Sequence, residues 1–437
     1  MTDAPGRWKL QGLIEKLLFF SPFVFPLYLL RFELLGVPFT LPEAYCYLLF
    51  ALYLYAVWRG QMSAGWGRPA RWYYKMAFVI LVGASLGVLT VPHYIDLPSG
   101  ELLDAQRVAL GVWKGWLLAP MLYFYVLTQQ LSRADQVKKL LQAFVYSGAL
   151  VALASYAYGM FSEGMTYDFR LSGFYESANY LSLYLVPALL LGIYFLLQGR
   201  SRLNLAAVTV MVHALFMTKS YAAILGIFGA LGLYVLVILV RLKLSRKKLF
   251  MALALLFITF VAVVGSQLRS EKFRQFLDLE NRSSSSVRLE IYEISWGLIN
   301  EYPLTGVGPG LFQAYYQTHG PEYLGRAPME WNIPHPHNVF LAFWLNAGLL
   351  GFLAFLGLLI LAHRRITYPM LALWGLLIHG LFDTPFWKND LAMIFWLLIG
   401  AILILQSHGT HSSKKSAAPI RKRASVRYSN SAKARRI

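Results

Sequence analysis

Runs of about twenty apolar residues recur along the whole sequence, separated by short polar or basic segments. Each run is long enough to cross the hydrocarbon core of a bilayer as an α-helix. The alternation of apolar and polar residues that marks the strands of a membrane β-barrel is missing. The pattern predicts an all-α polytopic membrane protein with about twelve transmembrane helices, at residues 13–32, 40–58, 74–92, 109–131, 139–161, 175–197, 203–218, 221–240, 249–266, 339–362, 367–383 and 388–406.

An even number of spans places both termini on one side of the membrane. The segments on that side hold 27 of the 40 Lys and Arg residues, although the longest loop lies on the other side. Basic residues concentrate in the cytoplasmic segments of membrane proteins. The distribution therefore predicts cytoplasmic termini.

Composition supports the membrane assignment and limits other functions. Hydrophobic residues make up 57% of the 437 residues and charged residues only 14%, far from the balance of soluble domains. The single cysteine, Cys46, lies in an apolar run, so no internal disulfide and no Cys-based metal site is expected. Much of the net charge of +19 lies in a polar tail, which predicts contact with anionic lipid headgroups rather than nucleic acid.

These patterns divide the chain into four parts, which are nine spans in 1–266, an outward-facing loop in 267–338, three spans in 339–406 and a basic, disordered cytoplasmic tail in 407–437. The loop carries positive charge on the translocated side, against the general bias. An anionic ligand would explain this. The basic residues of the loop are Arg269, Lys272, Arg274, Arg282, Arg288 and Arg326.

Within the loop, the serine run 283–286 predicts the N-terminal cap of an amphipathic helix that begins near Val287 and ends near Tyr302. Arg288 falls in the first turn of this predicted helix, where the helix dipole disfavours a cation. Free backbone N–H groups and a guanidinium at one helix end suit phosphate oxygens. The alternative is a salt bridge between Arg288 and an acidic residue of the loop.

The loop ends in "WNIPHPHN", which holds two histidines at the rim of a span. Pro336 restricts His335 to an extended conformation, so His335 and His337 are expected on one face. Asn338 is a good N-cap for the following helix. The helix end would lower the pKa of His337 and keep it neutral, as a general base requires. A structural histidine cluster and a metal site are the alternatives, but the sequence shows no third and fourth metal ligand.

Other polar residues lie at the outer ends of spans. Arg170 and Asn179 flank the start of the sixth span, and Lys219 lies in a very short outer turn. Such groups usually face a cavity or another helix, so Asn179 has a packing role as its alternative. The last outer turn, "HGLFDTPFWKND", contains Asp383 and Lys388. Asp383 either pairs with a loop arginine or orients a histidine.

Taken together, "GFYESANYLSLYL", "VRLEIYEISWGLINEYPLTGVGPGLF", "PHPHNVFLAFWLNAGLLGFLAF" and "HGLFDTPFWKNDLAMIFWLLIGA" resemble the O-antigen ligase and polymerase family of bacterial envelope glycosyltransferases. The resemblance covers about half the chain. It implies the fold of lipid-dependent (GT-C-like) glycosyltransferases in the bacterial inner membrane, with the active site on a periplasmic loop. It also implies a metal-independent, inverting reaction without a cofactor. The donor would be a glycan on undecaprenyl pyrophosphate, and the acceptor a sugar hydroxyl of lipid A–core.

The resemblance also assigns roles by position. Arg288 matches the arginine that binds pyrophosphate, His337 the essential histidine and Asn179 the asparagine of the sixth-span motif. The turn "TKSYAA" departs from the Ser-Arg or Thr-Arg of the family, so Lys219 would supply that charge without the bidentate geometry of arginine. The sequence leaves open whether Arg170, Lys219 or Arg326 assists Arg288, and His335, Asn338 and Asp383 are expected to support the site.

Three alternatives remain at this level. A polymerase would use a second lipid-linked repeat unit as the acceptor. Protein O-glycosylation is a further possibility within the family, although those relatives carry a longer periplasmic extension after the last span. A polysaccharide transporter belongs to another class, and it would show paired halves with broken helices near the midplane. The polar groups gather instead on one side of the membrane.

Overall fold

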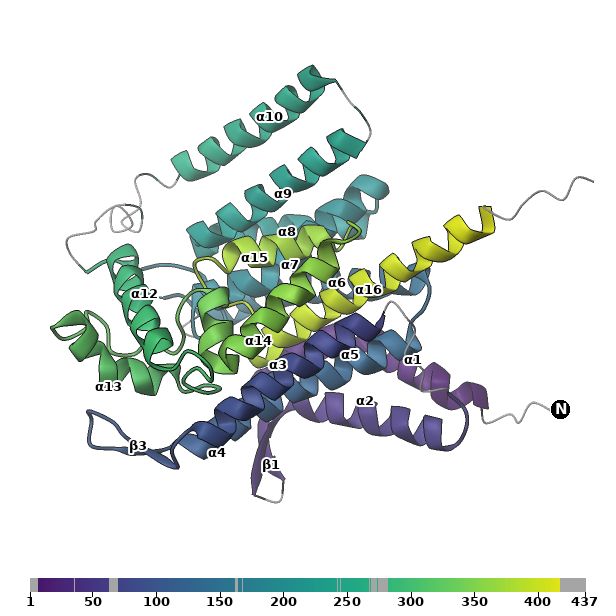
Figure 1. Ribbon diagram of the computed structural model, residues 1–437. Coiled ribbons are helices and arrows are strands. Elements are labelled where there is room, and N and C mark those ends of the chain that lie inside the picture. Colours follow the sequence, from purple (N-terminus) through teal and green to yellow (C-terminus); the bar gives the residue numbers. More distant parts are fainter. Residues whose placement is uncertain are drawn as a thin grey trace, which may run out of the picture.

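A computed structural model describes residues 7–34, 36–62, 70–161, 164–166, 168–241, 243, 245–266, 268, 273 and 282–416. Its helices form one long bundle (Figure 1). They are α1 (Arg7–Val24), η1 (Phe25–Leu29), α2 (Leu41–Trp58), α3 (Ala70–Thr90), α4 (Ala105–Val112), the π-helical η2 (Trp113–Leu118), α5 (Ala119–Gln130), α6 (Ala134–Phe161), α7 (Ala178–Gln198), α8 (Arg202–Thr218), α9 (Tyr221–Arg241), α10 (Arg246–Gly265), α12 (Ser284–Glu301), α13 (Phe312–Leu324), α14 (Val339–His363), α15 (Met370–His379) and α16 (Asn389–Ser416).

The apolar segments predicted from the sequence form helices. Ten helical segments of the described chain are long and apolar enough to cross a membrane, and the apolar helices α8 and α15 are shorter. Each of the twelve predicted spans overlaps one of these helical segments, although α15 is shorter than its predicted span. The prediction of an all-α polytopic membrane protein is therefore confirmed.

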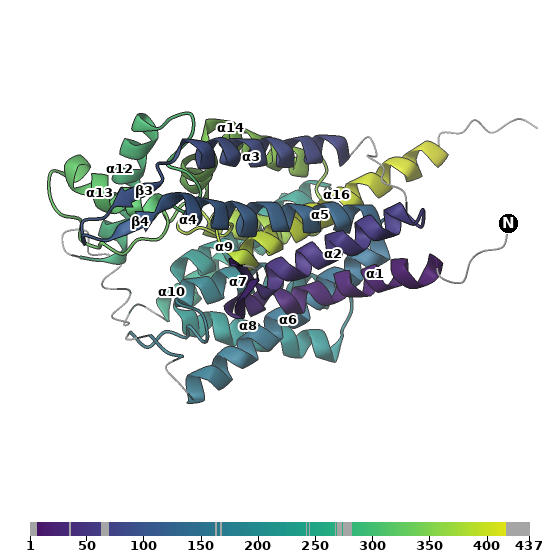
Figure 2. The same cartoon turned by 90° about the horizontal axis from the view of Figure 1, so that it is seen from below.

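The helices α12 and α13 lie at the end of the bundle opposite to the start of α1 (Figures 1 and 2). The amphipathic helix expected from the serine run is α12, whereas α13 was not expected. Two antiparallel hairpins were also not expected, β1 (Arg31–Leu34) with β2 (Val37–Thr40) and β3 (Tyr94–Asp96) with β4 (Leu102–Asp104).

Some predicted features fall on other parts of the chain. The loop residues Arg269, Lys272 and Arg274 lie outside the described residues, as does most of the predicted tail. The helix α16 continues to Ser416, beyond the predicted end of the last span at residue 406.

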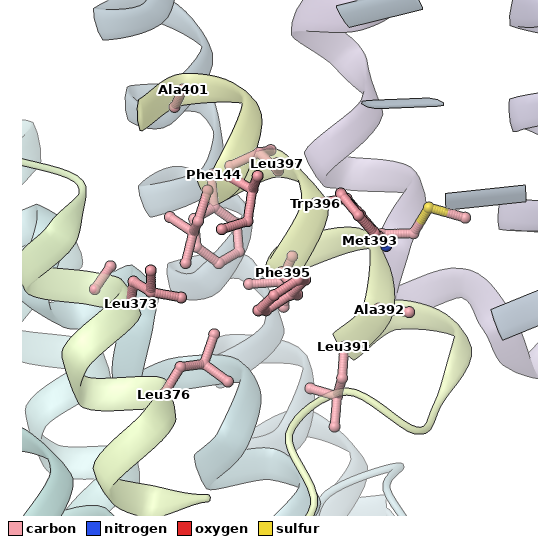
Figure 3. Close-up of a cluster of buried hydrophobic side chains, with 14 of the residues drawn as sticks. Phe144, Leu373, Leu376, Leu391, Ala392, Met393, Phe395, Trp396, Leu397 and Ala401 are labelled. Carbon is pink, nitrogen blue, oxygen red and sulfur yellow. The ribbon is translucent and has the colours of Figure 1, made fainter. Parts of the chain in front are cut away.

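The helix α16 runs through the middle of the bundle, and 83% of its membrane-spanning window is buried. The aromatic ring of Trp396 is fully buried and lies 4.9 Å, between ring centroids, from that of Phe124 on α5. Figure 3 shows Phe144 of α6 and Leu373 and Leu376 of α15 near Phe395 and Leu397 of α16. Because lipid is as apolar as these side chains, close packing rather than exclusion of water holds such helices together.

The helices α3 and α14 approach closely through small residues. A Cβ atom added at Gly83 would lie 2.4 Å from the backbone oxygen of Ala347 and 2.7 Å from the amide nitrogen of Gly351. Small residues let two backbones meet in this way. The contact fixes the first half of α14 against the rest of the bundle.

The helix α14 is interrupted at Gly348, whose φ of 66° and ψ of −179° are not helical. Gly348 lies against the Gly-rich turn after α12, because the Leu349 amide donates to the carbonyl of Leu304 over 3.1 Å. On the other side of the break, the Val307 amide donates to the carbonyl of Leu345 over 2.9 Å. The turn thereby ties α12 to the span that follows the two histidines.

The predicted span 367–383 needs correction. The helix α15 covers only Met370–His379, and at about 1.5 Å per residue its length is roughly half the thickness of the hydrocarbon core. Residues 380–388 continue as an irregular, largely buried segment, which includes Asp383 and Lys388. Irregular backbone is tolerated at such depth only where protein surrounds it.

Candidate active site

The helix α12 positions Arg288. Ser283 is its N-cap and forms a capping box with Ser286, so the serine run caps the start of the helix as expected. The helix begins at Ser284, three residues earlier than predicted, which moves Arg288 from the first turn to the second. The Arg288 Nη1 donates to the Ser284 carbonyl over 2.9 Å, and Nε donates to the Phe382 carbonyl over 3.1 Å. These bonds hold the guanidinium between α12 and the irregular segment before α16.

A cavity of about 380 Å³ opens beside α12. Three cationic residues line it, namely Arg288, Arg170 from the segment before α7, and Lys219 from the turn between α8 and α9. Asn179 and Ser285 contribute polar groups to the same wall. Three of the residues expected to bind an anion are therefore brought together with Asn179.

Lys219 and Arg170 are held in different ways. Lys219 caps α8 in a left-handed conformation, with φ at 48°, which residues other than glycine seldom adopt. Among the described residues, its Nζ has one weak contact, 3.5 Å from the carbonyl of Asp168. Arg170 is more firmly anchored, because its Nε donates to the Thr218 carbonyl and its Nη2 donates to the Asn179 Oδ1, each over 2.7 Å. Asn179 thus holds a cavity-lining cation in position.

The histidines form a second cluster beside this cavity. Asn338 caps α14, and its Oδ1 accepts from the amides of Phe340 and Leu341. His337 precedes the cap in a left-handed conformation, with φ at 46°. The ring centroids of His335 and His337 are 4.4 Å apart, so the two side chains share one face, as predicted from their spacing.

Asp383 lies against both histidines with its side chain 1% exposed. Its Oδ1 is 3.6 Å from the His337 Nδ1 and 3.9 Å from the His335 Nε2, and it accepts from the Thr384 amide over 2.8 Å. Burial raises the pKa of Asp383, but the contacts with His337 and His335 outweigh burial and hold the pKa well below its usual range. The sequence left two roles for Asp383, pairing with a loop arginine or orienting a histidine. The structure places Asp383 beside the histidines.

His335 has hydrogen-bond partners for both ring nitrogens. Its Nε2 is 2.8 Å from the Tyr180 hydroxyl, and its Nδ1 is 3.0 Å from the Thr384 Oγ1. Burial and the neighbouring His337 lower the pKa of His335 from 6.5 to about 3, although Asp383 opposes the shift. His335 is therefore neutral at physiological pH.

His335, His337 and Asp383 also form a group that could hold a metal ion, since their ligand atoms lie within 4.8 Å of one another. The hydrogen bonds of His335 argue against this use. A ligand nitrogen must present its lone pair to the metal, whereas both nitrogens of His335 already face hydroxyl groups. Only His337 and Asp383 would remain, and two ligands do not fit the usual donor sets.

Tyr292 joins the cation-lined cavity to the histidine cluster. This residue of α12 lines the cavity, and its hydroxyl donates to the His337 carbonyl over 3.2 Å and to the Leu381 carbonyl over 3.0 Å. His337 itself is not among the described residues that line the cavity. A ligand with an anionic part in the cavity would extend past Tyr292 toward His337.

Arg326, the remaining candidate cation, lies elsewhere. It forms a salt bridge with the buried Glu290 on α12. Such a salt bridge within the loop was the alternative to anion binding that the sequence left open for a loop arginine. The sequence did not indicate Tyr180, Tyr292 or Thr384. Two of them lie next to predicted residues, because Tyr180 follows Asn179 and Thr384 follows Asp383, whereas Tyr292 lies four positions after Arg288.

Fold and site together define a polytopic α-helical membrane protein with a cation-lined cavity beside a histidine–carboxylate cluster. Residues 205–356 match the family model described as O-antigen ligase. This match confirms the resemblance seen in the two motifs that lie within these residues. The match includes Lys219, Arg288, His335, His337 and Asn338. Among curated proteins, no match was found.

Proposed function

We propose that this protein transfers a glycan from undecaprenyl pyrophosphate to a sugar hydroxyl of lipid A–core, as an O-antigen ligase. The observation that carries the proposal is the cavity lined by Arg170, Lys219 and Arg288 next to the cluster of His337 and Asp383. The family match supports the same type of enzyme. A pyrophosphate in the cavity would meet cations, and a sugar beyond it would meet a base.

The donor lipid has a suitable apolar surface. A groove of about 490 Å³ runs between α7, α8, α9 and α10 and is lined almost entirely by aliphatic and aromatic side chains. Phe216 and Ala223 line this groove, and Lys219 to Ala222 between them line the cation-lined cavity. A molecule with a polyprenyl chain in the groove would therefore place its pyrophosphate beside Lys219.

The reaction follows from these positions. His337 takes the proton of the acceptor hydroxyl, whose oxygen attacks the anomeric carbon and forms the new glycosidic bond. The bond between that carbon and the pyrophosphate oxygen breaks, and its electron pair leaves with the pyrophosphate. Arg288 and Lys219 stabilise the charge that develops there, and Asp383 stabilises the imidazolium of His337. Attack opposite the leaving group inverts the anomeric centre.

The proposed location is the bacterial inner membrane, with cytoplasmic termini and the site at the periplasmic face. The distribution of basic residues supports this orientation. So does the position of α12 and α13, at the bundle end opposite to the start of α1 (Figure 1).

Purified full-length protein with a defined undecaprenyl-pyrophosphate-linked glycan tests the proposal, with lipid A–core supplied or left out and the products separated on a gel. The expected product is glycan-bearing lipid A–core, formed only when that acceptor is present. Longer lipid-linked chains from the donor alone would replace the ligase with a polymerase. Folded protein that converts neither substrate would refute both and favour a polysaccharide transporter.

A further inference from the structure

A lysine lies buried among aromatic rings behind the histidine cluster. Lys388 belongs to the irregular segment before α16 and is only 7% exposed. Its Nζ lies 3.8 Å from the ring centroid of Tyr180, 4.4 Å from that of Tyr28 and 4.9 Å from that of Tyr175. Within the described residues Nζ has no hydrogen-bond partner. The contacts that hold this ammonium group are thus the faces of three tyrosine rings.

One of these rings connects the lysine to the site. Tyr180 presents its face to Lys388 and its hydroxyl to the His335 Nε2, 2.8 Å away. A cation on the face of a phenol draws electron density from the ring and strengthens the hydroxyl as a donor. When Tyr180 donates, the His335 Nε2 must accept, and its Nδ1 then carries the proton and donates to the Thr384 Oγ1.

We propose that Lys388 is a positioning residue for the glycan transfer, acting through the Tyr180 hydroxyl to fix His335 as a neutral hydrogen-bond acceptor beside His337. The inference rests on the proposed function. With His335 fixed in this way, the carboxylate of Asp383 is free to stabilise positive charge on His337. The ring of His335 also forms one wall against which the ring of His337 is oriented, at 4.4 Å between centroids.

The charges around Lys388 support a protonated side chain. Burial lowers the pKa of Lys388, whereas the carboxylates of Asp390, Glu176 and Asp383 oppose that shift, and Arg31 adds to it. Asp390 is the largest of the opposing influences and is itself fully buried at the start of α16. These carboxylates favour the ammonium form of Lys388 against the effect of burial.

The groups that face His335 come from three other parts of the structure. They are Tyr180 on α7, Arg288 on α12, and Asp383 and Lys388 in the segment before α16, in addition to the adjacent His337. Lys388 and Arg288 both favour neutral His335, and Asp383 alone among the charged groups favours the imidazolium. Removing the Lys388 charge therefore weakens the preference for the neutral ring.

A double-mutant cycle tests this inference on purified full-length protein. Lys388→Met and Tyr180→Phe are each expected to lower kcat about tenfold, the equivalent of about 1.4 kcal/mol, with the donor KM nearly unchanged. Since Lys388 acts through the Tyr180 hydroxyl, the double variant is expected to lose about tenfold and not a hundredfold. Lys388→Gln serves as a second neutral variant in case Lys388→Met does not fold.

A matched control is Lys114→Met. The Lys114 Nζ also lies over an aromatic ring, 3.9 Å from the centroid of Phe39, but its charge partner is Glu43. Lys114 has no contact with either histidine among the described interactions, so its replacement is expected to leave kcat unchanged. An equal loss in this control would mean that the effect of Lys388 reflects stability alone.

Two results would overturn the inference. The first is a loss of kcat in Lys388→Met that is equally large in the Tyr180→Phe background. The second is strict additivity of the two substitutions in Tm, measured in detergent without substrate, because the coupling to the hydroxyl predicts a smaller combined decrease. The Tm measurements test the coupling of Lys388 to Tyr180 even if the wild-type protein forms no product. A wild-type protein without product would instead refute the proposed function.

Discussion

The role of Asp383 gives the most detailed prediction. Asp383→Asn keeps the shape of the side chain but removes the charge next to His337. At 3.6 Å and an effective dielectric constant of about 20, the attraction between a carboxylate and an imidazolium is roughly 4 to 5 kcal/mol. With the proton about half transferred in the transition state, about 2 to 3 kcal/mol of this stabilisation is lost. The expected decrease in kcat is roughly 30- to 150-fold.

Steady-state transfer to lipid A–core measures this effect, with the donor KM determined in the same experiment. Because Asp383 does not line the cation-lined cavity among the described residues, the donor KM is expected to change little. Glu43→Gln is a suitable control, since Glu43 is a buried carboxylate paired with Lys114 rather than a histidine. An unchanged kcat in folded Asp383→Asn, or a loss confined to KM, would refute the reasoning.

Three further predictions concern binding, the backbone and pH. Lys219→Met should raise the donor KM about tenfold, because it removes a phosphate contact. Lys219→Arg should leave the donor KM unchanged or lower it. An unchanged KM in both variants would exclude Lys219 from the donor site. Gly348→Ala should cost roughly 3 kcal/mol of stability, because the added Cβ would lie 2.2 Å from the Leu304 oxygen at a φ of +66°. Its Tm should fall well below that of the control Gly12→Ala, whose added Cβ meets no atom within 4 Å. Unfolded His335 binds a proton below about pH 6.5 while folded His335 stays neutral to about pH 3, so stability should decrease as pH falls through this range. His335→Gln should flatten the decrease in Tm, and an unchanged pH dependence would contradict the assignment of neutral His335.

Much of the fold could be predicted because membrane spans depend on local composition. A run of apolar residues identifies a span wherever its neighbours lie, and the observed helices coincide with the predicted runs. Caps are also local. The serine run and Asn338 lie next to the helices that they cap, and both act as expected.

The missed features depend on contacts between distant segments. The early end of α15 could not be read from the apolar run, because the buried irregular segment after it is stabilised by surrounding helices. The helix register of α12 differed by one turn, since any residue of the serine run could serve as the cap. Tyr180 and Lys388 meet across more than two hundred positions of the sequence, so no spacing rule connects them.

The central claim is that Arg288 binds the donor pyrophosphate and that His337 acts on the acceptor. The most direct test measures donor binding and single-turnover transfer side by side in wild-type, Arg288→Ala and His337→Ala protein, each shown to elute as a monodisperse species. The account predicts that Arg288→Ala loses about ten- to hundredfold in affinity for undecaprenyl pyrophosphate, whereas His337→Ala binds it normally and forms no product. Product formation by His337→Ala near the wild-type rate, or unchanged binding by Arg288→Ala, would contradict it.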